Sequence, residues 1–128
     1  MNFAEYRDLC LSLKATEETY PFGPEAAWFK VGGKAFAWTF VEPFTMDGEQ
    51  KPPFTFVNMK CDPERIEALR EAHAAIQPGW HQNKKFWNSV YMDGTLSPDL
   101  IRELTQHSYE IVLGSLTKKL QKEISDGS

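Results

Sequence analysis

The feature that most restricts the fold is a pair of strand-like segments separated by two glycines. Residues 27–31 (AWFKV) and 34–40 (KAFAWTF) are rich in aromatic and β-branched side chains, and Gly32-Gly33 lies between them. Because glycine adopts the positive φ angles that a two-residue turn requires, this region is predicted to be a β-hairpin. Such a turn would pair Phe29 with Phe36. It would also place five apolar side chains on one buried face: Phe29, Val31, Phe36, Trp38 and Phe40.

Helices are predicted where capping residues precede an apolar pattern of helical spacing. Asn2 and Glu5 form a capping box for a first helix that runs to about Lys14. Asp62-Pro63 supplies a cap and a first-turn proline for a second helix, which ends before Pro78. Ser97-Pro98 starts the C-terminal helix in the same way. Its pattern slips at residues 106–108, where we expect a break or kink.

Two further strands complete the predicted elements, at residues 54–60 and 86–92. Residues 16–24, with two prolines and a glycine, are predicted to be an ordered loop, and residues 42–53 a long polar connection. The order is helix, three strands, helix, strand and one or two helices. This order predicts an α+β fold: a mainly antiparallel sheet of four to six strands with helices packed on one face.

Length and charge favour one small globular domain. A chain of 128 residues fits a single domain, here residues 1–124, with a frayed tail at 125–128. We expect a monomeric cytoplasmic protein, because no signal peptide or membrane-spanning run is present. The net charge of −4 argues against a surface that is basic throughout, so any anion site must be local.

The best candidate for a local site is the segment 78–91 (PGWHQNKKFWNSVY), which contains two lysines and no acidic residue. Cations beside flat aromatic rings can bind phosphates and stack on bases, and the side chains that would do so are Trp80, His81, Asn83, Lys84, Lys85 and Trp87. The segment could instead line an aromatic pocket for a protein or small ligand, formed by Trp80, His81, Asn83, Trp87 and Asn88. A third reading is structural: the aromatics fill a core and the lysines point into water.

Metal, cofactor and catalytic functions are not indicated by the residue patterns. His73, His81 and His107 lie on separate elements without a local ligand pair, and the two cysteines form no metal-binding motif. No nucleophile elbow or phosphate-binding loop is present, so we expect no enzymatic activity and no cofactor. A small basic face of Lys118, Lys119 and Lys122 is a second candidate for contact with an anionic polymer.

Several segments together resemble the MmcQ/YjbR-like family of small bacterial proteins. They follow one another along nearly the whole chain: YPFGP (20–24), FKVGGKAFA (29–37), KCDPE (60–64), PGWHQNKK (78–85), WNSV (87–90) and HSY (107–109). The resemblance implies a frataxin/CyaY-like α+β fold. It also implies DNA binding through a "double wing" of β-hairpins.

Under this resemblance the leading hypothesis is a non-enzymatic protein that binds DNA. Lys84, Lys85, His81 and Trp80 would make the contacts, with Lys30 and Lys34 assisting beside the hairpin turn. So few cations predict weak, salt-sensitive binding. The connection 42–53 is longer than the family pattern implies, so one wing is expected to be remodelled.

Overall fold

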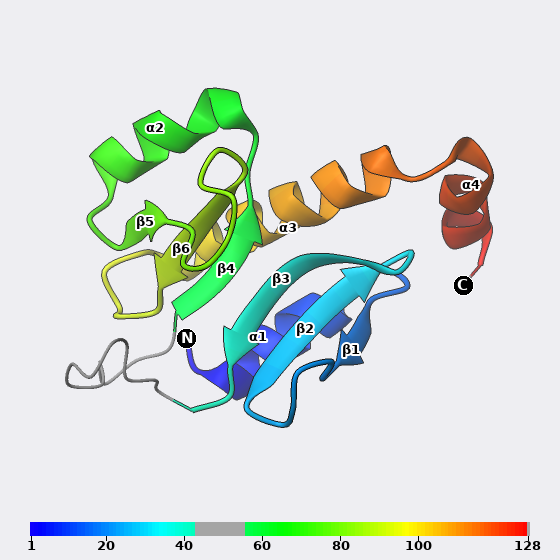
Figure 1. The fold of residues 1–128 in the computed structure, drawn as a ribbon, viewed down its shortest axis with the longest axis horizontal. Coiled ribbons are helices and arrows are strands. Elements are labelled where there is room, and N and C mark those ends of the chain that lie inside the picture. The colour runs from blue at the N-terminus through cyan, green and yellow to red at the C-terminus, as the bar shows by residue number, and fades with distance from the viewer. Residues whose placement is uncertain (43–55, 128) are drawn as a thin grey trace.

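The computed structural model describes residues 1–42 and 56–127 (Figure 1). The helices are α1 (Phe3–Leu11), α2 (Pro63–Ala72), α3 (Pro98–Ser115) and α4 (Lys118–Asp126). The strands are β1 (Glu17–Thr19), β2 (Ala26–Val31), β3 (Lys34–Phe40), β4 (Phe56–Lys60), β5 (Ile76–Pro78) and β6 (Trp87–Tyr91). The predicted connection 42–53 lies almost entirely outside the described residues.

One antiparallel sheet organises these elements, with the strand order β1-β2-β3-β4-β6-β5. Helices α1 and α3 lie behind the sheet in Figure 1, while α2 lies beside the edge strand β5. The α+β class and the antiparallel sheet with helices on one face are therefore confirmed. No helix among the described residues is long and apolar enough to cross a membrane.

The main core lies between the sheet and the helices α1 and α3. Tyr6 and Cys10 of α1 and Val112 of α3 contact a strand surface that includes Phe29 and Val31, all of them at most 1% exposed. Burying a side chain of this size stabilises the fold by roughly 1.5–3 kcal/mol, so this layer is the main source of stability.

A β-bulge in β3 changes the predicted hairpin register. Phe29 pairs with Ala37 and Lys30 with Ala35, which leaves Phe36 as the extra residue. Phe36 consequently packs edge-on against Tyr109 of α3, with ring centroids 5.4 Å apart. The predicted pairing of Phe29 with Phe36 is wrong, because alternation cannot continue through a bulge.

Trp38 and Phe40 lie on the other face of the sheet, away from α1 and α3. There Trp38 stacks on Trp28, with ring centroids 4.8 Å apart and planes 6° apart. Phe40, Trp80, Ala26 and Trp87 extend this second cluster. The prediction of one buried aromatic face is therefore wrong, since the bulge divides the aromatics of β3 between two faces.

Other sequence predictions are wrong for the two shortest strands and for the ends of the helices. The predicted loop 16–24 contains β1, and the predicted end of the second helix contains β5, because α2 already ends at Ala72. α3 runs without a break through residues 106–108, and the helical break lies at Leu116 and Thr117, where Thr117 caps α4. α4 also extends to Asp126, two residues into the tail that was expected to fray.

Candidate functional site

Two hairpin connections project from the same end of the sheet. The β2–β3 turn at Gly32-Gly33 follows Val31, and the β5–β6 loop of residues 79–86 precedes Trp87. The strand pairing places both connections at the same end of β4. Ala37 of β3 pairs with Met59 of β4, and the next residue of β4, Lys60, pairs with Trp87 of β6. β4 therefore ends between two hairpins, and this end of the sheet is called the hairpin end below.

The 79–86 loop is held in one conformation by hydrogen bonds to its neighbours. Gly79 N donates to Trp87 O (3.0 Å), and Trp80 N donates to Ser89 Oγ (2.9 Å). Asn58 Nδ2 of β4 donates to Trp80 O (3.1 Å). A Cβ at Gly79 would lie 2.7 Å from Cβ of Trp87, so this close approach of loop and strand requires glycine.

Arg70 of α2 anchors the second half of the loop. Its Nε donates to Asn88 Oδ1 (2.8 Å), and its terminal nitrogen donates to Lys84 O (2.7 Å) and Trp87 O (3.2 Å). All of these acceptors are neutral, so the guanidinium brings an uncompensated positive charge to the loop. A cation held this firmly is preorganised for an anion.

The predicted site residues of the loop divide into structural and exposed groups. Trp87 is 9% exposed, and the half-buried Trp80 packs on the second aromatic cluster. Asn83 caps its own turn: Oδ1 accepts from Lys85 N (3.0 Å), and its carbonyl accepts from Phe86 N (3.1 Å). His81 is exposed and has a left-handed backbone (φ 54°), which is uncommon for a residue other than glycine. The structural interpretation of this segment therefore fits Trp80, Asn83 and Trp87, because the contacts of these side chains lie within the protein.

The four lysines predicted for the hairpin region all lie at the hairpin end, but they differ in exposure and in hydrogen bonding. Lys85 and Lys34 are exposed, whereas Lys84 Nζ donates back to Gly79 O (3.0 Å). Lys30 is half-buried, and Glu17 of β1 lies opposite it in the strand pairing. Lys34 is thus the freer of the two lysines beside the β2–β3 turn.

Two further cations at the hairpin end were not among the predicted site residues. Lys60 places Nζ 5.8 Å from the centroid of the Trp87 ring, and Arg70 reaches the loop from α2. Ion pairs within the described residues join Arg7 to Glu18, Arg65 to Glu103 and Arg102 to Asp99, and none includes Lys60, Arg70, Lys84 or Lys85. Only tertiary structure adds Lys60 and Arg70 to the neighbouring Lys84 and Lys85, so no local motif could reveal these two further cations.

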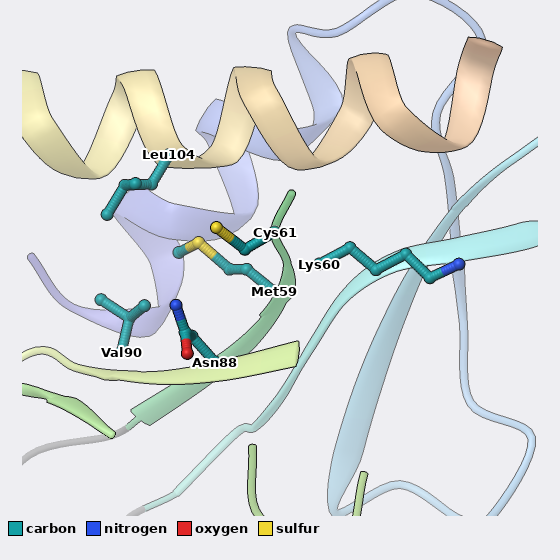
Figure 2. Close-up of a pocket in the computed structure, with 6 residues that line it drawn as sticks. All are labelled: Met59, Lys60, Cys61, Asn88, Val90 and Leu104. Carbon is teal, nitrogen blue, oxygen red and sulfur yellow. The ribbon is translucent and has the colours of Figure 1, made fainter. Parts of the chain in front are cut away.

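Two hollows adjoin Lys60 and Cys61. The inner one has a volume of about 10 Å³ and lies between the sheet and α3; Figure 2 shows Cys61 and Met59 directed toward Leu104 while Lys60 extends away. This volume holds at most a water molecule. The outer hollow measures about 290 Å³ and is lined by Lys60, Cys61, Asp62, Pro63, Phe86 and Ile111. Of these two hollows, only the outer one can admit a ligand.

The outer hollow has a fixed backbone at Phe86 and a neutral thiol at Cys61. Cys61 N donates to Phe86 O (2.8 Å), which fixes the backbone of Phe86 beside the hollow, and Phe86 is 45% exposed. Burial raises the pKa of the Cys61 thiol, which therefore stays neutral at pH 7. The described residues contain no group of three or more His, Cys, Asp or Glu side chains arranged for a metal.

The fold and the hairpin end define a class: a small α+β domain with a six-stranded antiparallel sheet, two hairpins separated by β4, and cations on and beside the 79–86 loop. The YjbR family model matches residues 11–111, and the chain belongs to this family. YbdF of Escherichia coli O157:H7, described as uncharacterized, is 36% identical over 119 residues, which is 93% of this chain and 90% of YbdF. YjbR of Escherichia coli K12, also described as uncharacterized, is 29% identical over 122 residues, 95% of this chain and 96% of YjbR.

Solved structures show the same fold. Protein DR2400 of Deinococcus radiodurans has a TM-score of 0.83 and 37% identity, covering 97% of this chain and 88% of its own. A Pseudomonas syringae protein has a TM-score of 0.73 and 24% identity over 88% of this chain and 99% of its own. The resemblance to the family is thereby confirmed, whereas the relatives' descriptions give no function.

Proposed function

We propose that this protein is a non-enzymatic DNA-binding protein whose contact surface is the hairpin end of the sheet. The observation that supports this most is the position of Lys60, Arg70, Lys84 and Lys85 on or beside the 79–86 loop, in a chain whose net charge is −4. Lys34 adds a cation at the β2–β3 turn of the same sheet end. Phosphate contacts by lysine and arginine fix a protein on nucleic acid without reading its sequence. A local cluster therefore explains how an acidic chain can bind a polyanion.

The two hairpin connections would contact the phosphates from both sides of β4. Lys85 and His81 are the exposed groups of the 79–86 loop, and Lys34 is exposed at the β2–β3 turn. Lys30 contributes less, because Glu17 lies opposite it. Trp80 supports the loop from below, since its ring packs 5.7 Å from Phe56 and Phe40. With about five cations, binding should be weak and should fall steeply as salt rises.

Fluorescence polarisation with labelled duplex and single-stranded DNA tests this proposal, at about 50 mM and about 200 mM salt. The variants are Lys85→Glu and Lys84→Glu/Lys85→Glu. Arg102→Glu is the matched control, because it makes the same charge change on the exposed surface near the start of α3. Lys118→Glu/Lys119→Glu examines the basic face of α4.

The loop variants should weaken binding at low salt by at least about tenfold, and Arg102→Glu should change it less than about twofold. Absence of binding at low salt, or equal effects of Lys85→Glu and Arg102→Glu, would overturn the proposal. Circular dichroism and the thermal midpoint must match the parent protein, since Lys84 Nζ bonds to Gly79 O.

A protein- or small-ligand-binding role is the second candidate, and the outer hollow favours it. The lining of this hollow includes none of the residues predicted for an aromatic pocket: Trp80, His81, Asn83, Trp87 and Asn88. The hollow combines apolar walls with the charged groups of Lys60 and Asp62, which is the usual composition of a ligand site. A ligand of this kind would bind with little salt dependence and without loss in Lys85→Glu. Isothermal calorimetry of the parent protein and Ile111→Trp with candidate ligands checks that outcome.

A further inference from the structure

The outer hollow lies directly beside the cations of the hairpin end. Phe86, which forms one wall, ends the 79–86 loop, and Lys60, which forms another, lies opposite Trp87 in the sheet. Ile111 of α3 and Pro63 of α2 supply further apolar wall. A chain of phosphates bound by Lys60 and Lys85 would therefore pass the opening of an apolar recess.

We propose that this recess binds one unstacked base of a single-stranded DNA whose phosphates are held by the hairpin end. The inference rests on the proposed function and specifies the form of nucleic acid. The half-exposed ring of Phe86 offers a face on which a base can stack. The volume of about 290 Å³ is at the lower limit for a ligand site and suits a single planar ring system.

Charge decides which part of the strand enters the recess. Asp62, whose Oδ1 accepts from Glu64 N at the start of α2, lines the recess, and its negative charge repels a phosphate, whereas the neighbouring Cys61 thiol is neutral. Lys60 lines the recess and holds Nζ 5.8 Å from the centroid of the Trp87 ring, and Lys85 is exposed one residue before Phe86. The neutral base therefore enters and the charged backbone stays outside. A duplex cannot bind in this way without unpairing a base.

The walls are rigid before any ligand arrives, which favours binding. Phe86 O is held by Cys61 N, and Phe86 N donates to Asn83 O, so the backbone beside the ring is fixed at both ends. Asp62 N donates to His107 Nε2 (3.2 Å), which joins this wall to α3. A preformed site loses little conformational entropy on binding.

Fluorescence polarisation with three labelled probes of equal length tests the inference: a single strand, the same strand without bases, and a duplex. The parent protein should bind the single strand at least about fivefold more tightly than the abasic strand, because this is the lower end of what stacking of one base contributes. Phe86→Leu keeps an apolar side chain without a π face, and Ile111→Trp fills the recess. Both should bind the single strand no better than the abasic strand, while duplex binding stays unchanged. Leu11→Trp, at an exposed position on α1, is the matched control.

The outcomes separate the two proposals. Equal affinity of the parent protein for the single and abasic strands overturns the inference, as does an unchanged preference in Phe86→Leu and Ile111→Trp. In either case a loss of binding in Lys84→Glu/Lys85→Glu would leave the proposed function standing. If no probe binds at low salt, the proposed function fails and the inference fails with it. Heteronuclear NMR spectra of each variant check that the fold is retained.

Discussion

The two faces of the sheet satisfy their buried polar groups in different ways. On the face covered by α1 and α3, Tyr6 Oη bonds to Thr105 Oγ1 (3.0 Å), and Ser108 Oγ donates to Phe36 O (2.5 Å) and accepts from Lys60 N (2.8 Å). On the opposite face, the buried Nε1 atoms of Trp28 and Trp38 have no hydrogen-bond partner. On that same face the buried side chains of Asn58 and Ser89 bond to each other and to the backbone of Trp80. Polar contacts therefore tie the helices to the sheet on one face. On the other face they are found beside the 79–86 loop, whereas ring packing holds the stack of Trp28 and Trp38.

The largest expected effect removes the hydroxyl that joins α3 to two strands. Ser108→Ala leaves the Phe36 carbonyl and the Lys60 amide without this partner, which should lower the free energy of unfolding by about 2–4 kcal/mol. Urea denaturation followed by circular dichroism measures this loss. The control is Ser115→Ala, an exposed serine on the same helix, which should change stability by less than about 0.5 kcal/mol. Equal effects of the two substitutions would contradict the assigned role.

Alkaline pH should act on the helical face through Cys10. Burial raises the pKa of this thiol from 9.0 to about 12, so the folded protein retains a proton that the unfolded chain releases. The contribution of Cys10 to the free energy of unfolding is therefore fully present below pH 9 and is lost as the pH rises toward 12. Cys10→Ala should make this fall less steep by up to about 1.4 kcal/mol per pH unit.

Urea denaturation at several pH values measures the slope. Tyr6, whose pKa is also raised by burial, contributes at the upper end of this range in both proteins. A uniform loss of stability in Cys10→Ala, with the same slope as the parent protein, would contradict the prediction.

The smallest expected effects compare one polar group from each face. Tyr6→Phe removes a paired hydroxyl and should cost about 1 kcal/mol. Trp38→Phe removes an unpaired indole N–H, and relief of that buried donor should offset the lost ring volume, so stability should change by less than about 1 kcal/mol. Chemical denaturation measures both. A loss for Trp38→Phe clearly above that for Tyr6→Phe would contradict the difference between the faces.

Local signals predicted most of the fold. The Asp62-Pro63 and Ser97-Pro98 starts give α2 and α3 their observed first residues, and the Gly32-Gly33 turn is where the sequence predicts it. Local signals failed where a distant partner decides the structure. The helical pattern slips at residues 106–108, but the helix continues there, and the hydroxyl of Ser108 bonds to the backbone of Phe36 and Lys60 across the core. The strands β1 and β5, with three residues each, exist only because a neighbouring strand pairs with them.

The candidate site shows the same division. The sequence indicated the 78–91 segment because its composition is unusual, and the structure places its exposed groups at the hairpin end. The contribution of Arg70 could not be predicted, because it depends on α2 lying beside the loop. Ile111 and Phe86 meet at one hollow only after α3 packs on the sheet. Tertiary contacts thus decide which cations and aromatics share a surface.

The two outermost strands of the sheet also influence self-association. β1 and β5 contain three residues each, and β5 ends in Pro78, which has no amide hydrogen to donate. Each free edge consequently offers few backbone groups to a strand from another molecule. The long, aromatic strands that could template aggregation, β2, β3 and β4, are enclosed between neighbours. Aggregation by strand pairing therefore requires that an outer strand first detaches.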